Sequence, residues 1–288
     1  MKLARELNLR VLIAVVALGL GQASHAQGND AAGRPPVSGR PAAPEGWTLT
    51  LGVGPVLSPA WQGSRDTTLS LFPDLRINYG DTFFASVPEG IGLNAVNQDG
   101  WRAGPVVKIR FGRKESSGGS PFIIAGGSDA LRGLGNVGAA AEVGGFVEKR
   151  LGARREWRVR SEVRRGFGGH EGVVAEGSIA YQLRAGRAII NIGPRATIVS
   201  GDYMQTYFGI DAGQSLRSGI SPYDAKGGLL SYGVGSSLIR PLDSRSAITV
   251  FAALDRLGDE AAKSSLVRER GRKTQFTIGM AYGFRFNL

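Results

Sequence analysis

Hydrophobic and polar residues alternate one by one along most of this chain. The last segment, KTQFTIGMAYGFRFNL at 273–288, shows the pattern clearly. Every second residue from Thr274 to Phe286 is mostly aromatic or aliphatic, and the residues between them are small or polar, with glycines at 279 and 283. Successive side chains of a β-strand point to opposite faces. The segment therefore predicts a strand with one apolar face and one small, polar face.

Twelve segments share this alternation and predict an all-β fold. Most of them are longer than the usual strand of about 5–6 residues. Their length suits a tilted strand that crosses a bilayer, which needs about 9–11 residues. The alternation is weakest at 82–95 and 203–211. The expected strands lie at roughly 47–57, 67–79, 82–95, 101–112, 138–150, 156–166, 172–184, 187–199, 203–211, 227–240, 245–257 and 274–286.

Aromatic residues lie near the ends of the apolar faces, where an outer-membrane barrel has its interfacial girdles. In lipid every backbone N–H and C=O needs a partner, and among strand structures only a closed barrel provides them all. We therefore predict a transmembrane antiparallel up-and-down β-barrel of about 12 strands, within a range of about 10–12. A secreted β-sandwich would alternate in the same way, but its strands are seldom so long and so many. The aromatic residues are Trp47, Tyr79, Trp101, Phe111, Trp157, Tyr181, Phe284 and Phe286.

The beginning of the chain has the features of an export signal. A basic start, MKLARELNLR, precedes the apolar run VLIAVVALGLG and the small residues Ser24 and Ala26 of a cleavage site. We expect a signal peptide at 1–26, a flexible leader rich in Pro, Gly and Ala at 27–46, and the barrel at 47–288. Loss of residues 1–26 lowers the net charge from +11 to +9. The chain has no cysteine, which excludes a disulfide scaffold and a lipoprotein.

Charged residues fall on the polar faces of several predicted strands, and we expect them inside the barrel. In RVRSEVR, Glu162 alternates with arginines. Paired carboxylates could indicate a glycosidase, and Glu142, Glu148, Glu162 and Glu176 are the candidates. A ladder of opposite charges that fills or lines the lumen explains the same pattern without catalysis. The possible lumen-lining residues are Arg102, Lys108, Arg110, Glu142, Arg158, Arg160, Glu162, Arg164 and Arg195.

Other chemistry finds little support, and we expect no catalytic, metal or cofactor site. His170 is the one histidine beyond the signal peptide, and its setting, GFGGHEGVV, predicts a solvated loop residue. No G-x-S-x-G motif accompanies it, and one histidine without cysteines offers too few nitrogen or sulfur ligands for zinc. In an exported protein the basic excess favours membrane lipids and lipopolysaccharide phosphates, not nucleic acid, as partners.

Several stretches together resemble the MipA/OmpV family of Gram-negative outer-membrane proteins, named for MltA-interacting protein. They are GVGPVLSPAWQGS (52–64), LRGLGNV (131–137), GHEG (169–172), YMQTYFGIDAGQSLRSGISPYDAKGG (203–228) and LDRLGDEAAKSSLV (254–267). The resemblance covers about residues 47–286. The loop residues that match the family pattern are Tyr203, Tyr207, Gly209, Ser218, Gly219, Tyr223, Arg256, Leu257, Gly258 and Asp259.

The resemblance implies a non-enzymatic outer-membrane barrel. The named family member is regarded as a scaffold that brings a murein hydrolase, a lytic transglycosylase, together with a penicillin-binding protein that synthesises the cell wall. Two alternatives stay open. One is a small porin-like channel for anions or small solutes, and the other is a barrel lipid enzyme that uses His170.

Overall fold

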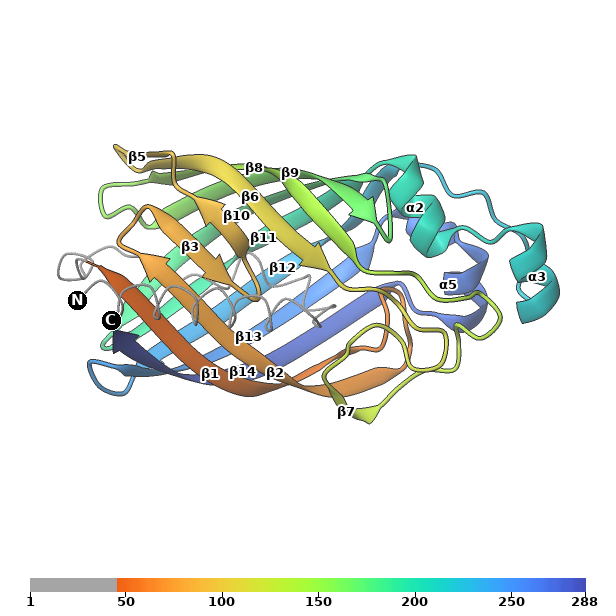
Figure 1. Cartoon of the computed structure of the whole chain (residues 1–288), viewed down its shortest axis with the longest axis horizontal. Helices are drawn as coiled ribbons and strands as arrows, with labels where there is room; N and C mark the ends of the chain where they lie inside the picture. The colour runs from red at the N-terminus through yellow and green to blue at the C-terminus, as the bar shows by residue number, and fades with distance from the viewer. Residues whose placement is uncertain (1–45) are drawn as a thin grey trace, which may run out of the picture.

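The computed structural model describes residues 46–288, so the predicted signal peptide and most of the predicted leader lie outside the described residues. Twelve strands form the wall of one barrel (Figure 1). They are β1 (Trp47–Pro59), β2 (Thr67–Tyr79), β3 (Phe83–Ser86), β4 (Gly90–Leu93), β6 (Trp101–Arg110), β8 (Ala140–Leu151), β9 (Trp157–Gly168), β10 (Val173–Ala185), β11 (Ala188–Val199), β12 (Gly228–Pro241), β13 (Ser246–Leu257) and β14 (Thr274–Asn287). Two short strands, β5 (Val96–Gln98) and β7 (Ile123–Gly126), add to the edges of β6 and β2.

The first strand closes the barrel. β1 pairs with β14 on one side and with β2 on the other, so that Leu51 lies opposite both Phe284 and Leu75. Every pairing in the wall is antiparallel between neighbours around the ring. The predicted transmembrane antiparallel barrel of about 12 strands is therefore confirmed. No helix within residues 46–288 combines the length and apolar character needed to cross a membrane.

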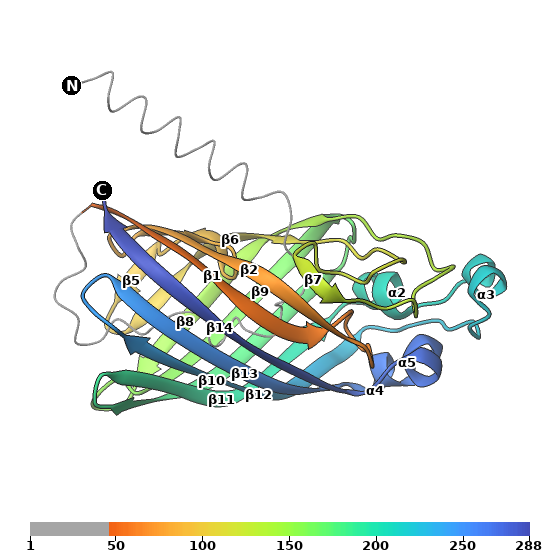
Figure 2. The ribbon, with the colours of Figure 1, turned by 90° about the horizontal axis from the view of Figure 1, so that it is seen from below.

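The two ends of the barrel differ. At one end, here called the turn end, the connections 80–82, 152–156, 186–187 and 242–245 are short. At the other, the loop end, long connections fold into four helices (Figure 2). These helices are α2 (Gly201–Phe208), α3 (Ala212–Ser218), α4 (Asp259–Lys263) and α5 (Ser265–Arg270).

Two of the twelve predicted strands are wrong in detail. The segment 203–211 forms helix α2, because Tyr203, Met204, Tyr207 and Phe208 have the spacing of one helical face and all are buried. The segment 82–95 forms two strands, β3 and β4, joined by a tight turn at 87–89. The total still agrees, because splitting one strand compensates for the loss of the other.

The outer face of the barrel is an apolar belt. On β14, Phe276, Met280 and Tyr282 are 47%, 44% and 46% exposed, and the outward residues of the other long strands are similar. Exposed apolar area on this scale is typical of a surface that faces lipid.

The glycines of β14 lie on its inner face, where they leave room for other side chains. Phe251 of β13 lies opposite Gly279 and packs over it inside the barrel.

The long connections build a hydrophobic core over the loop end, here called the cap. Met204, Phe208, Ile220 and Leu266 are fully buried in it. The core also includes residues from the rim of the barrel on several sides: Ala60 and Trp61 beyond β1, Val174 on β10, Val199 on β11, Leu230 on β12 and Leu257 on β13. The cap is therefore anchored around much of the rim.

We expect Gly279→Ala to destabilise the barrel by about 1–3 kcal/mol, the usual cost of overpacking. An added Cβ would clash with Cζ of Phe251. The matched control is Gly235→Ala on β12, also inward-facing, where the nearest atom is 3.6 Å away on Arg195. Urea unfolding in detergent micelles measures both changes. Equal stability of the two variants would show that the contact with Phe251 does not constrain position 279.

Candidate functional site

The lumen has one strongly charged wall, built by β6, β8, β9 and β10. All the predicted lumen residues except Arg195 come from β6, β8 and β9. Their inward positions are buried, whereas the outward neighbours Val143, Val147 and Val163 are 41–53% exposed. Strand pairing brings the charges together, because Lys108 lies opposite Glu142 and Glu148 lies opposite Arg160.

Glu142 is the centre of this wall near the loop end. Its Oε1 accepts a hydrogen bond from Arg110 Nε, and its Oε2 accepts one of 2.8 Å from Arg164 Nε. His170 Nε2 also lies 3.0 Å from Oε1. With 1% of its surface exposed, the carboxylate has little access to water, so these partners must offset the cost of burying its charge.

The network continues toward the turn end through Arg164 and Glu162. Arg164 Nη2 donates to Glu176 on β10 at 2.8 Å, and its Nη1 pairs with Glu162. Glu162 also lies 2.8 Å from Lys108 Nζ and 2.7 Å from Arg160 Nη2. The charges thus form one connected ladder instead of isolated pairs.

The far end of the ladder is held by Glu148. Its carboxylate is 3.7 Å from Arg160 Nη1 and 3.4 Å from Arg150 Nε. The Arg160 guanidinium also stacks 4.2 Å from the centre of the Phe146 ring. Arg102 and Arg158 lie buried at this end, and Arg102 also approaches Asp81 at 3.6 Å.

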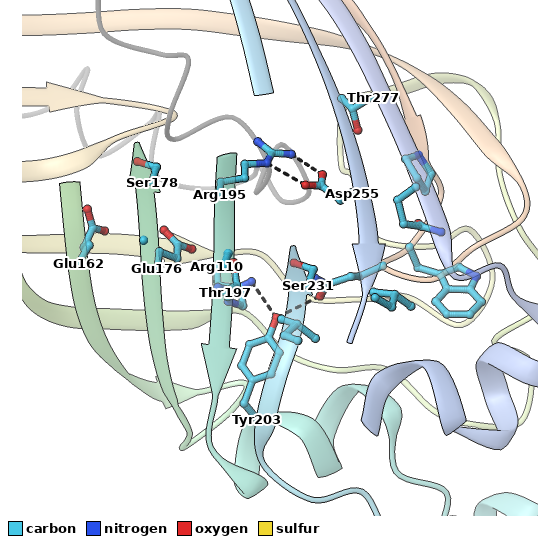
Figure 3. Close-up of a pocket in the computed structure, with 18 of the residues that line it drawn as sticks. Arg110, Glu162, Glu176, Ser178, Arg195, Thr197, Tyr203, Ser231, Asp255 and Thr277 are labelled. Atoms are coloured by element: carbon cyan, nitrogen blue, oxygen red, sulfur yellow. Dashed lines mark hydrogen bonds and ion pairs between the residues drawn. The ribbon is translucent and has the colours of Figure 1, made fainter. Parts of the chain in front are cut away.

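The opposite wall of the lumen carries few charges. Arg195 on β11 forms a bidentate ion pair with Asp255 on β13, in which Arg195 Nε lies 2.8 Å from Asp255 Oδ1. Between the two walls, beneath the cap, lies a cavity of about 120 Å³ (Figure 3). Besides the charged groups, its polar lining comes from Gln62, Ser178, Thr197, Ser231, Gln275 and Thr277. This composition suits water or a small polar solute.

Tyr203 joins the cap to the charged wall. Its hydroxyl accepts a hydrogen bond of 3.0 Å from Arg110 Nη1 and lies 3.3 Å from Gln62 Oε1, and the Arg110 guanidinium lies over its ring (Figure 3). Burial raises the pKa of Tyr203, and also that of Tyr207, above the ordinary tyrosine value. Both phenols are therefore neutral at physiological pH, and Tyr203 can donate to Gln62 while it accepts from Arg110.

Arg113, three residues beyond the end of β6, contacts the same helix α2. Its Nη1 donates to the Tyr207 carbonyl at 2.7 Å, and its guanidinium lies 5.8 Å from the centre of the Tyr207 ring. Burial lowers the pKa of Arg113 to about 10. The residue is still a cation at neutral pH, so its charge reinforces the hydrogen bond.

His170 is not the solvated loop residue that the sequence predicted. It is 2% exposed and packs against the rings of Tyr203 and Tyr207. Its Nδ1 accepts a hydrogen bond from the Gly172 N–H at 3.2 Å, so Nε2 carries the hydrogen that points to Glu142. The short loop holds the ring against the charged wall because Gly166 leaves room for it.

The family-motif residues lie at the loop end, where they shape the cap. Tyr203 and Tyr207 are on α2, Gly209 follows it, and Ser218 and Gly219 end α3. Gly219 has a φ of +74°, a conformation that favours glycine. Tyr223 donates to the Glu260 carbonyl at 2.9 Å. Arg256 and Leu257 end β13, Gly258 caps α4, and Asp259 begins it.

Several residues of this site were not assigned to the lumen from the sequence. Trp61, Gln62, Tyr203 and Asp255 line the cavity, and His170 completes the shell of Glu142. The sequence suggests that Arg195 has a carboxylate partner on one of the later strands, but it does not identify Asp255. β12 lies between the strands of these two residues, and the register of the three strands cannot be read from the sequence.

A model of the family described as MltA-interacting protein MipA matches residues 51–286. The chain belongs to the MipA family. With the lipid-facing belt and the closed wall, this membership makes it an outer-membrane β-barrel. In such barrels the short turns face the periplasm and the longer loops face outward. We expect the same orientation here, with the turn end in the periplasm and the cap outside.

Solved structures with a related shape are outer-membrane proteins. An outer membrane channel from Pseudomonas putida F1 is 12% identical, with 88% of this chain and 100% of that chain covered and a TM-score of 0.45. The NanC porin is 10% identical over 82% and 98%, with a TM-score of 0.41. OmpT of Vibrio cholerae is 7% identical over 83% and 96%, with a TM-score of 0.34. No curated protein matches the sequence.

We expect Glu142→Gln to destabilise the protein by about 3–5 kcal/mol, because the buried Arg110 would lose its carboxylate partner, whereas Arg164 keeps Glu162 and Glu176. Glu171→Gln is the control, since Glu171 is exposed in the same β9–β10 connection and accepts one hydrogen bond, from Gly168 N–H. Surface changes of this kind usually stay within about 0.5 kcal/mol. Urea unfolding compares the two variants, and hydrogen exchange of α2 reports whether the cap loosens. A Glu142 variant as stable as the control would show that the ladder does not support the fold.

Proposed function

We propose that this protein is a non-enzymatic scaffold in the outer membrane that holds a murein hydrolase and a murein synthase together at its periplasmic end. The observation that supports this most directly is the cap. A single hydrophobic core joins residues from several sides of the rim at the loop end. A cap that packs on the rim at the outer end leaves the turn end as the surface that cell-wall enzymes in the periplasm could reach.

The turn end has the charge expected of a docking surface. Exposed arginines gather on its connections and on the strand ends beside them: Arg154, Arg155, Arg184, Arg187, Arg240 and Arg245. The exposed acidic groups there include Asp99 and Asp243. A basic rim attracts acidic protein surfaces and the carboxylates of murein. The family description, MltA-interacting protein, names a protein partner and so supports the same proposal.

The buried network gives no support to the lipid-enzyme alternative. Both ring nitrogens of His170 have partners, Gly172 N–H and Glu142. A general base needs a free nitrogen within reach of a nucleophile. His170 could gain one only by breaking the contacts that hold the loop against the charged wall. The histidine is therefore explained as a structural residue.

We expect the immobilised full-length mature protein, reconstituted in nanodiscs, to capture a lytic transglycosylase and a penicillin-binding protein from envelope extract. Reversing the charges of Arg154, Arg184 and Arg187 to Glu should reduce capture at least roughly tenfold, because rim charges govern encounter and orientation. The control reverses Arg132, Lys226 and Lys263, which are exposed on the cap. Mass spectrometry identifies what is bound. Capture of neither enzyme class would refute the scaffold, and equal loss in both triple variants would refute the assigned surface.

A porin-like channel is the second candidate, because the cavity beneath the cap leaves part of the lumen unfilled. Under the scaffold proposal, liposomes that carry the folded protein should admit small sugars and anions no faster than empty liposomes. Arg160→Ala should leave this flux at baseline, since the cap still covers the lumen. Solute uptake that depends on Arg160 would instead establish a pore. Heat-modifiable migration on gels confirms that each preparation is folded.

A further inference from the structure

The closed wall of the barrel contains two unusually short strands at one place. β3 and β4 span four residues each, and the turn at 87–89 reverses the chain partway up the wall. Within residues 46–288, β4 pairs with β6 at two positions, Ile91–Val107 and Gly92–Val106. Beyond that turn, toward the loop end, the short strand β7 pairs with β2 at Thr68, Leu69 and Ser70. Within residues 46–288 no strand pairs with β6 on this side beyond Val107, and the space between β2 and β6 is visible in Figure 1.

The outer surface of this space is an apolar groove, with a cavity of about 190 Å³. Ile77 and Ala85 at its floor are 1% and 7% exposed, although both lie on the outward face, where the neighbouring Tyr79 is 48% exposed. An engineered apolar cavity of about 150 Å³ in another protein holds benzene, so this groove has room for a stretch of hydrocarbon. Its other main lining residues are Leu75, Val87, Ile91, Val107, Ile109 and Phe111.

Aromatic packing backs the groove on the lumen side. Phe84, Val106 and Phe146 form a small buried cluster, with the two rings 5.7 Å apart and edge to face. These residues alternate with the groove residues Ala85 and Val107 along their strands, so they occupy the inward face. These side chains therefore separate the groove from the lumen, and the groove opens toward the membrane.

Positive charge lies level with the groove and just beyond its loop-end side. The register Val107–Val143–Arg165 places the exposed Arg165 two strands from the groove, about 10 Å at the usual strand spacing. Its guanidinium lies 5.9 Å from the centre of the Phe167 ring, and Phe167 lies opposite Ala141, which lines the groove. Lys114, also exposed, follows Phe111 by three residues in the loop that leaves β6.

We propose that this groove binds one acyl chain of lipopolysaccharide, with Arg165 and Lys114 contacting the phosphates of the lipid. The groove opens on the lipid-facing belt, so its occupant is a hydrocarbon chain of the membrane. The cations lie at the outward-facing end of the barrel, where the phosphorylated glycolipid of the outer leaflet has its headgroup. An acyl chain would occupy the groove beside the short hairpin, and the phosphates of the same lipid would pair with the neighbouring cations.

The test is native mass spectrometry of the mature protein in detergent after incubation with short-chain lipopolysaccharide or, separately, with phosphatidylglycerol. Wild type should retain lipopolysaccharide. Val107→Trp, which fills the groove, should weaken retention at least roughly tenfold, because several methylenes lose their site. Val250→Trp is the matched control, since Val250 on β13 is 38% exposed on the same outer face and Val107 is 39% exposed.

Arg165→Gln gives a second test that does not depend on filling the groove. It removes one exposed charge, so the barrel should fold normally, and retention of lipopolysaccharide should become weaker and less sensitive to salt. Three results would overturn the proposal. They are undiminished retention by folded Val107→Trp, equal loss in Val250→Trp, and equal retention of phosphatidylglycerol and lipopolysaccharide by wild type.

Discussion

The need to pair every backbone group within the membrane governs this structure. β1 satisfies it by bonding to β2 along its whole length and to β14 along most of its own. Once the ring is closed, each strand must present one face to lipid and the other to a narrow interior. The alternation along the chain is a direct result, and it extends to the glycine that makes room for Phe251 inside the barrel.

The interior meets a second constraint, because charges within it have limited access to water. The chain places its carboxylates and guanidinium groups on adjacent strands, so that each buried Glu of the ladder contacts at least two cations. The opposite wall uses small and hydroxyl side chains instead. The cavity lies between these two walls. The cap has a polar anchor on the charged wall, where Tyr203 contacts Arg110.

The fold could be predicted from the sequence because long segments in which apolar and polar residues alternate indicate strands with one face toward lipid and the other toward the lumen. Helix α2 was missed because Tyr203 and Tyr207 are also compatible with a short apolar strand, and its burial depends on the distant Leu266 and Trp61. The charged faces could likewise be assigned by parity. The partners could not, because Arg195 meets Asp255 across 60 residues through a register that only the closed barrel defines. His170 shows the same limit, since its loop gives no sign of the carboxylate beneath it.

The cap joins segments that lie far apart in the sequence. Arg65 donates to the Glu269 carbonyl across 204 residues, and Trp61 donates to Ser128 across 67. Contacts this distant in sequence close late, because long chain segments must first be brought together. We therefore expect the cap core to form after β1 meets β14, with its connections still unfolded when the barrel inserts. The loop end of a newly inserted barrel would then stay open until these connections fold.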